Sequence, residues 1–126
     1  MPGKPFTATL REPVMQLKNG VIIDLYGEIN GSVETTLNNA YELAEAGQPA
    51  MIVLNFKDVD YINSTGIALI VGLLARARKA KRTLTVFGLS EHYMEIFNIT
   101  RLADFMSVYP DEQAVIANLT TKTSEP

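Results

Sequence analysis

A nearly continuous apolar run, Met51–Phe56, lies near the middle of the chain. A strand with one face in water shows polar residues at alternate positions, whereas a run of this kind is typical of a strand covered on both faces. Such strands belong to parallel sheets, whose neighbouring strands are connected through helices. The run therefore predicts a central strand in a sheet that helices cover.

Strand patterns and helical patterns alternate on both sides of this run. The β-branched and aromatic segment Val21–Tyr26 predicts a strand, and apolar residues at helical spacing over Ser32–Ala46 predict a helix after it. After the run, we expect a loop over Lys57–Asn63 and a helix from about Ser64 to Lys81. The other predicted elements are strands at Phe6–Leu10, Val14–Leu17, Thr83–Phe87 and Met106–Tyr109, a helix at Ser90–Phe97, and a last helix with Pro110 at or near its first position. This alternation is typical of an α/β domain with a partly parallel sheet.

Length and composition fit one domain. The chain has 126 residues, of which 47% are hydrophobic and 20% are charged, as in ordinary globular proteins. We expect a single domain over residues 1–126, with its core from about residue 14 to residue 119 and a polar, frayed tail over residues 120–126.

Several classes of function are excluded by composition. The chain has no cysteine, which excludes a disulfide scaffold, a thiolate nucleophile and a cysteine-ligated metal centre, and its one histidine, His92, excludes a multi-histidine centre. A net charge of −3 argues against nonspecific binding of nucleic acid. The longest apolar stretch, Gly66–Ala75, has about half the length of a membrane span, and the first residues carry no apolar export signal. We therefore expect a cytoplasmic protein with no metal and no cofactor.

The turn before the second predicted helix is rich in capping residues. Asn63, Ser64 and Thr65 follow one another, and Gly66 comes directly after them. One interpretation is structural, since a strand-to-helix turn needs a cap and a tight bend. The other is functional, because the free N–H groups and the dipole at a helix N-terminus would stabilise a phosphate on a hydroxyl there.

The helix behind this turn is apolar nearly all round in its first turns. Leu69 and Leu73 add a second strip beside the expected buried stripe of Ile67, Ile70, Val71, Leu74 and Ala77. A helix of this kind is buried on more than one side or presents a face to a partner. Its C-terminal half is basic, which fits either complementarity with the helix dipole or a docking patch.

Signatures of catalysis are absent from the sequence. Ser64 has no Gly-x-Ser-x-Gly elbow around it, and the chain has neither a Walker loop nor a dinucleotide fingerprint. His92 lies in a surface type of helix, and Asp58 and Asp60 fit a solvated loop better than a cation site. We therefore expect a binding protein and not an enzyme.

Three segments in order resemble one protein family. They are Gly27–Asn30, the long segment Met51–Ile67 with its Asn-Ser-Thr-Gly turn, and Arg82–Ser90 followed by Ile96–Ile99. Together they resemble the STAS domain, and specifically the small bacterial anti-sigma factor antagonists, over about residues 14–119. The resemblance implies an α/β fold with a mixed sheet of four or five strands, helices mainly on one face, and the Asn63–Gly66 turn exposed at one edge of the sheet.

The resemblance also implies a phosphate switch. In that family the first hydroxyl residue of the turn, here Ser64, is phosphorylated by a partner anti-sigma factor with serine kinase activity. The unphosphorylated antagonist sequesters the anti-sigma factor and so releases a sigma factor, and a serine phosphatase resets the cycle. We expect the partner-binding residues to be Asn30, Asn63, Thr65 and Gly66, which lie in the segments that resemble the family, and Leu69 and Leu73, which form the second apolar strip of the helix.

Two residues depart from the family pattern. Asn63 and Asn30 stand where the family has aspartates, so both positions keep a hydrogen-bonding side chain and lose a negative charge. Ser64 is then either a poorer kinase substrate or a site where phosphate is tolerated more easily. A second hypothesis remains open, in which the chain is a STAS scaffold or an accessory subunit of a signalling or transport complex without a phosphate cycle.

Overall fold

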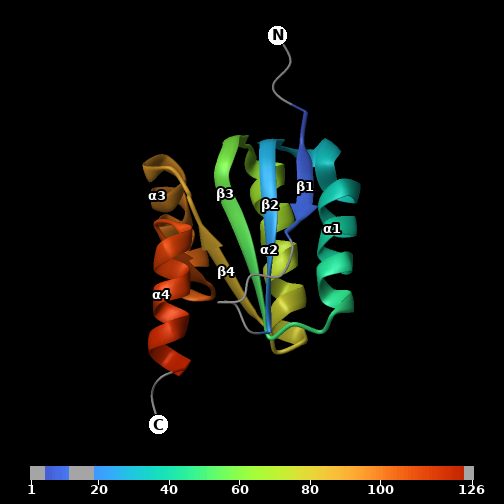
Figure 1. Ribbon diagram of the computed structural model, residues 1–126. Coiled ribbons are helices and arrows are strands. Elements are labelled where there is room, and N and C mark those ends of the chain that lie inside the picture. Colours follow the sequence, from blue (N-terminus) through green and yellow to red (C-terminus); the bar gives the residue numbers. More distant parts are fainter. Residues whose placement is uncertain (1–4, 12–18, 124–126) are drawn as a thin grey trace.

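The computed structural model describes residues 5–11 and 19–123. These residues form a five-stranded sheet in the order β1-β2-β3-β4-β5, with helices in the connections (Figure 1). The strands are β1 Thr7–Leu10, β2 Gly20–Ile29, β3 Met51–Ile62, β4 Thr83–Phe87 and β5 Ser107–Tyr109. The helices are η1 Gly31–Val33, α1 Glu34–Ala46, α2 Ser64–Lys79, α3 Glu91–Ile99, η2 Leu102–Asp104 and α4 Glu112–Thr123.

The sheet is mixed, as expected. β1 pairs antiparallel with β2, and the pairs β2–β3, β3–β4 and β4–β5 are all parallel. β3 is the central strand, and Ile52, Val53 and Leu54 are each 0% exposed. The prediction of a doubly covered central strand from the apolar run is therefore confirmed.

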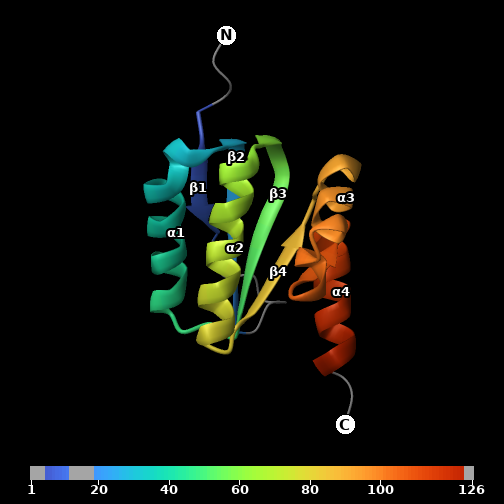
Figure 2. The same cartoon turned by 180° about the vertical axis from the view of Figure 1, so that it is seen from behind.

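Helices cover the two faces of the sheet unequally. α1, α2 and α3 lie on one face, and α4 lies on the other (Figures 1 and 2). The larger core forms under α1, α2 and α3 and includes Leu54, Leu73 and Phe97. A smaller cluster under α4 brings Val53 and Val115 together. Because side chains alternate along a strand, Val53 and Leu54 point to opposite faces and serve the two clusters.

The largest correction to the sequence-based elements concerns the segment predicted as the loop Lys57–Asn63. β3 continues to Ile62, because its second half pairs with the second half of β2, where Tyr26 lies opposite Asp58 and Ile29 opposite Ile62. The polar side chains that suggested a loop are exposed while the backbone stays in the ladder. The sheet therefore reaches the turn at Asn63 without an intervening loop.

The C-terminal helix also differs from expectation. α4 begins at Glu112, and the Asp111 carboxylate accepts a hydrogen bond from the Ala114 N–H at 2.9 Å. Asp111 is thus the N-cap, and Pro110 precedes the helix instead of opening it. The helix continues to Thr123, into the segment expected to be frayed. The strand predicted at residues 14–17 lies outside the described residues.

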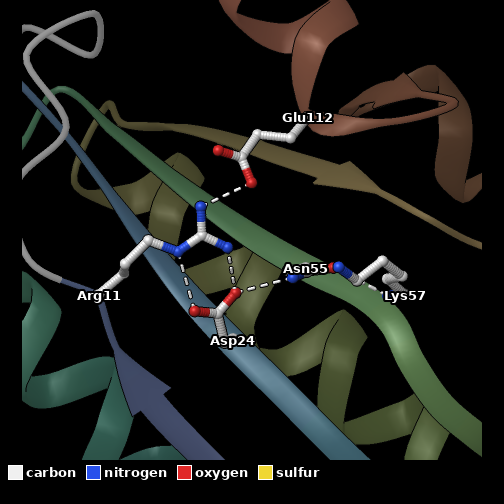
Figure 3. Close-up of polar contacts among 5 residues, drawn as sticks. All are labelled: Arg11, Asp24, Asn55, Lys57 and Glu112. Atoms are coloured by element: carbon white, nitrogen blue, oxygen red, sulfur yellow. Dashed lines mark hydrogen bonds and ion pairs between the residues drawn. The ribbon is translucent and has the colours of Figure 1, made fainter.

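A polar network joins β2, β3 and the residue that follows β1 to the start of α4 (Figure 3). Arg11 donates to both carboxylate oxygens of Asp24 and, at 2.6 Å, to Glu112 at the start of α4. The Asn55 side-chain amide donates to Asp24 at 2.7 Å and accepts from the Lys57 N–H at 2.9 Å. Partial burial by itself would raise the pKa of Asp24, but the hydrogen bonds from Arg11 and Asn55 outweigh it and lower that pKa.

We expect Asp24→Asn to lower stability at neutral pH, by about 1 kcal/mol because the ion pair is partly exposed. A carboxyl whose pKa is depressed in the folded state stabilises the fold above its unfolded pKa of about 3.9 and loses this effect as the pH falls through the folded value. The difference in free energy of unfolding between wild type and variant should therefore shrink between about pH 5 and pH 2. Urea denaturation across this range measures it, and a constant difference would assign the effect to packing alone.

A second prediction compares two leucines on neighbouring helices. Leu73 on α2 is 1% exposed and Leu43 on α1 is 66% exposed. We expect Leu73→Ala to lower the free energy of unfolding by about 2–5 kcal/mol, because it leaves a cavity in the larger core. Leu43→Ala should change it by less than about 0.5 kcal/mol. Denaturant titration of both variants checks this, and similar losses would contradict the placement of Leu73.

Candidate functional site

Two loops meet at the carboxyl ends of β2 and β3. The first loop, Asn30–Ser32, consists of the N-cap and first residues of η1, and the second loop, Asn63–Gly66, consists of the N-cap and first residues of α2. β2 and β3 are adjacent and parallel, so their carboxyl ends lie side by side. The Asn63 N–H donates to the Ile29 carbonyl at 3.1 Å, which joins the start of the second loop to the end of β2.

Both loops are shaped by an asparagine cap. The Asn63 side-chain oxygen accepts from the Gly66 N–H at 2.8 Å, and the Asn30 side-chain oxygen accepts from the Ser32 N–H at 2.9 Å. The Ser32 hydroxyl also donates to Asn30, at 2.6 Å. The structural interpretation of the capping residues is therefore confirmed for Asn63. This cap does not exclude the functional interpretation, because the hydroxyl of Ser64 takes no part in it.

The second loop is held against β2 by a close backbone contact. A Cβ atom on Gly66 would lie 2.3 Å from the Ile29 carbonyl oxygen, a separation that no side chain can occupy. A Cβ on Gly31 would lie 3.1 Å from the Thr65 methyl group. The first turn of α2 therefore packs directly on the end of β2 and on the first loop.

Ser64 and Thr65 form the exposed part of this arrangement. Ser64 is the first residue of α2, and the first turn of the helix contains no acidic side chain. The leading N–H groups of a helix have no partner within it, and they carry the positive end of its dipole. A hydroxyl here is accessible to another protein and lies where added negative charge is favoured.

The remaining predicted partner residues are less accessible. Leu73 is 1% exposed and lies in the larger core, so the prediction that it contacts a partner is wrong. Leu69 is half-buried and packs against the same core. Gly66 is buried, and the structure gives it the packing role described above. The exposed or half-exposed members of the predicted set are therefore Asn30, Asn63, Thr65 and Leu69.

One supporting contact was not foreseen from the sequence. The Ile62 N–H, the last of β3, donates to the Tyr93 hydroxyl at 2.8 Å. Tyr93 is in the first turns of α3, where Ser90 accepts its N–H as the N-cap. This contact supports the end of β3 just before Asn63. No pattern in the sequence relates Tyr93 to Ile62, since the two are far apart along the chain.

The basic end of α2 is partly structural. Arg76 and Arg82 both donate to Glu45 on α1, at 2.6 and 3.3 Å, and Arg82 also donates to the Pro49 carbonyl. These arginines connect α1 and α2.

In the part of the chain that the structure describes, no cluster of three acidic or histidine side chains could hold a metal ion. Within the same residues, no helix has the length and apolar character needed to cross a bilayer.

Comparisons with known proteins agree with this fold. A family model described as the STAS domain matches residues 12–115. The anti-sigma-B factor antagonist of Bacillus subtilis is 33% identical over 96 residues, which cover 75% of this chain and 86% of that protein. The corresponding protein of Listeria monocytogenes is 28% identical over 88 residues, covering 68% of this chain and 77% of that protein.

Solved structures share the architecture at low identity. An anti-sigma factor antagonist from Mycobacterium paratuberculosis has a TM-score of 0.76 at 16% identity, covering 92% of this chain and 95% of that one. The Bacillus cell fate determinant SpoIIAA in its phosphorylated form has a TM-score of 0.64 at 21% identity, covering 86% of this chain and 96% of that one. A sulfate transporter family protein from Wolinella succinogenes has a TM-score of 0.72 at 16% identity, covering 85% and 89%. The match to the family model and the aligned relatives together establish that the chain belongs to the STAS domain family.

Proposed function

We propose that this chain is an anti-sigma factor antagonist, a binding regulator and not an enzyme. The proposal is supported by relatives named anti-sigma-B factor antagonist, which align over 68% and 75% of the chain. The observation that carries it is the exposed Ser64 at the start of α2, in the second of the two asparagine-capped loops. In this proposal the exposed surface around Ser64 binds an anti-sigma factor and thereby releases a sigma factor.

Ser64 is the proposed point of control. A partner anti-sigma factor with serine kinase activity transfers the terminal phosphoryl group of ATP to the Ser64 oxygen, the hydroxyl proton passes to the kinase, and ADP leaves. A serine phosphatase hydrolyses the ester and restores the hydroxyl. The fold accepts the phosphate because the N-terminus of α2 stabilises negative charge by about 0.3–1 kcal/mol. The complex with the anti-sigma factor does not accept the phosphate, because a desolvated charge without a paired cation opposes binding.

Asn63 changes the charge next to the proposed phosphorylation site. Its side chain caps α2 as an aspartate would, but it places no negative charge beside Ser64. A phosphoserine carries about −1.5 to −2 charges at neutral pH, so a neighbouring aspartate would repel it. Of the two consequences that the sequence left open, we favour a phosphorylated state that the fold tolerates easily.

The proposed switch predicts the effects of substitutions at Ser64. Ser64→Asp should bind the partner anti-sigma factor about 100-fold more weakly than wild type, which corresponds to about 2.8 kcal/mol. Ser64→Ala should bind as wild type does and accept no phosphate. Titration calorimetry measures the affinities, and mass spectrometry after incubation with the partner and ATP identifies the modified residue.

Thr65→Ala is the matched control, because it removes the adjacent exposed hydroxyl and leaves Ser64 in place. It should still accept one phosphate. The switch would be refuted if Ser64→Asp bound as tightly as wild type while the kinase left Ser64 unmodified.

A separate substitution tests the role of Asn63. Asn63→Asp keeps the cap and adds a negative charge one residue before Ser64. Phosphorylation should therefore shift the melting temperature of this variant to a lower value relative to the shift that it causes in wild type, because the two like charges repel. Asn39→Asp, on the exposed side of α1, makes the same change of charge elsewhere and should behave as wild type. Equal temperature shifts in all three proteins would contradict the prediction.

A scaffold role without a phosphate cycle is the second candidate. It is favoured by the sulfate transporter family protein of Wolinella succinogenes, which has the same fold. A chain with this role would leave Ser64 unmodified by any kinase partner and would bind equally well with aspartate at that position.

A further inference from the structure

An apolar groove runs beside the second half of α2, away from Ser64. Its volume is about 460 Å³, and it lies between α2 and the segment that contains η2. The groove is lined by Val71, Leu74, Ala75, Arg78, Leu102 and Phe105. Val71 is 42% exposed and Phe105 is 53% exposed, although both are large apolar residues. Figure 2 shows this side of the molecule, with α2 in the middle of the helical face.

Positive charge without an acidic partner lies next to this groove. Arg78 lines the groove, and its guanidinium stacks over the Phe105 ring at 5.0 Å; Lys79 and Lys81 follow it closely in the chain and are exposed. None of these three cations pairs with a carboxylate within the described residues. The nearest acidic residue along the chain from Phe105, Asp104, already pairs with Arg101 at 2.6 Å. The rim of the groove therefore has a net positive charge.

We infer that this groove docks an acidic amphipathic helix of another protein. The apolar side of such a helix fills the space between Val71 and Phe105, and its carboxylates face Arg78 and the neighbouring lysines. A second copy of this chain fits less well. A two-fold symmetric pair would bury this positively charged patch on both copies, and the lining of the groove contains no carboxylate to face Arg78.

The groove is separate from the surface of the proposed phosphate switch. Val71 lies seven residues after Ser64, about 10 Å along the helix axis, and Arg78 lies about 21 Å along it. The Debye length at physiological ionic strength is about 8 Å, so a charge on Ser64 is largely screened at the rim of the groove. The chain can therefore hold the acidic helix in either state of Ser64. This inference does not depend on the proposed function.

The probe is a fluorescein-labelled synthetic peptide that forms a helix with leucines on one face and glutamates on the other. Fluorescence anisotropy with the full chain should show binding that weakens with added salt. The same peptide with lysine in place of every glutamate should not bind. Val71→Glu should weaken binding of the acidic peptide about tenfold or more, because it places a carboxylate in the apolar contact. Arg78→Glu should weaken it to a similar extent.

Two variants serve as controls. Leu43→Glu makes the same apolar-to-acidic change on α1, at a residue that is 66% exposed, and should bind the peptide as wild type does. Ser64→Asp should also bind as wild type. Val71→Ser should weaken binding without adding charge, and melting curves should show that all variants fold, since each replaced side chain is exposed or lies at a rim.

The inference is overturned if the acidic peptide does not bind, if the lysine peptide binds equally well, or if Leu43→Glu weakens binding as much as Val71→Glu. A dimer that Val71→Glu dissociates in sedimentation experiments would assign the groove to a second copy instead. Binding to phosphatidylserine vesicles that Val71→Glu abolishes, without binding of the peptide, would assign it to a membrane surface.

Discussion

The close contact between Gly66 and the Ile29 carbonyl sets the position of α2 and, with it, much of the molecule. Because a Cβ atom at Gly66 would lie 2.3 Å from that oxygen, the glycine must face β2. A helix turns once in about 3.6 residues, so residues four and seven positions later share that face. These are Ile70 and Leu73, each 1% exposed. One backbone contact thus places Ser64 at the protein surface and decides which apolar residues of α2 are buried.

The same contact explains why the sequence misplaced two residues of α2. Apolar residues surround the first turns of the helix, so their spacing fits two rotations about the helix axis that differ in whether Val71 or Leu73 faces the core. The sequence pattern favoured Val71, whereas the structure buries Leu73 and leaves Val71 42% exposed. The order of strands and helices was predictable because short apolar runs and helical spacing alternate along the chain. The rotation of α2 depends on a contact between backbones that side-chain patterns do not record.

Long-range polar contacts set a similar limit. Arg11 and Glu112 are 101 residues apart in the chain, and the charges at these two positions give no indication that they meet. The extension of β3 through its polar second half is of the same kind, because its partner is β2 and its side chains alone suggest a loop. The turn at Ser64 was located from local information, since an N-cap residue and the first turn of its helix are neighbours in sequence. The proposed phosphorylation of Ser64 is inferred from the family resemblance, and the substitutions described above test it.

The two outer strands of the sheet are also its shortest, with 4 residues in β1 and 3 in β5. A long, flat outer strand offers unpaired N–H and C=O groups on which another chain can add a strand, which is a common route to aggregation. Here the long, apolar strands β2 and β3 lie inside the sheet, and the strands at its two margins are short (Figure 1). Short outer strands therefore limit the length of backbone on which another chain could add a strand, even though large apolar side chains such as Val71 and Phe105 are exposed.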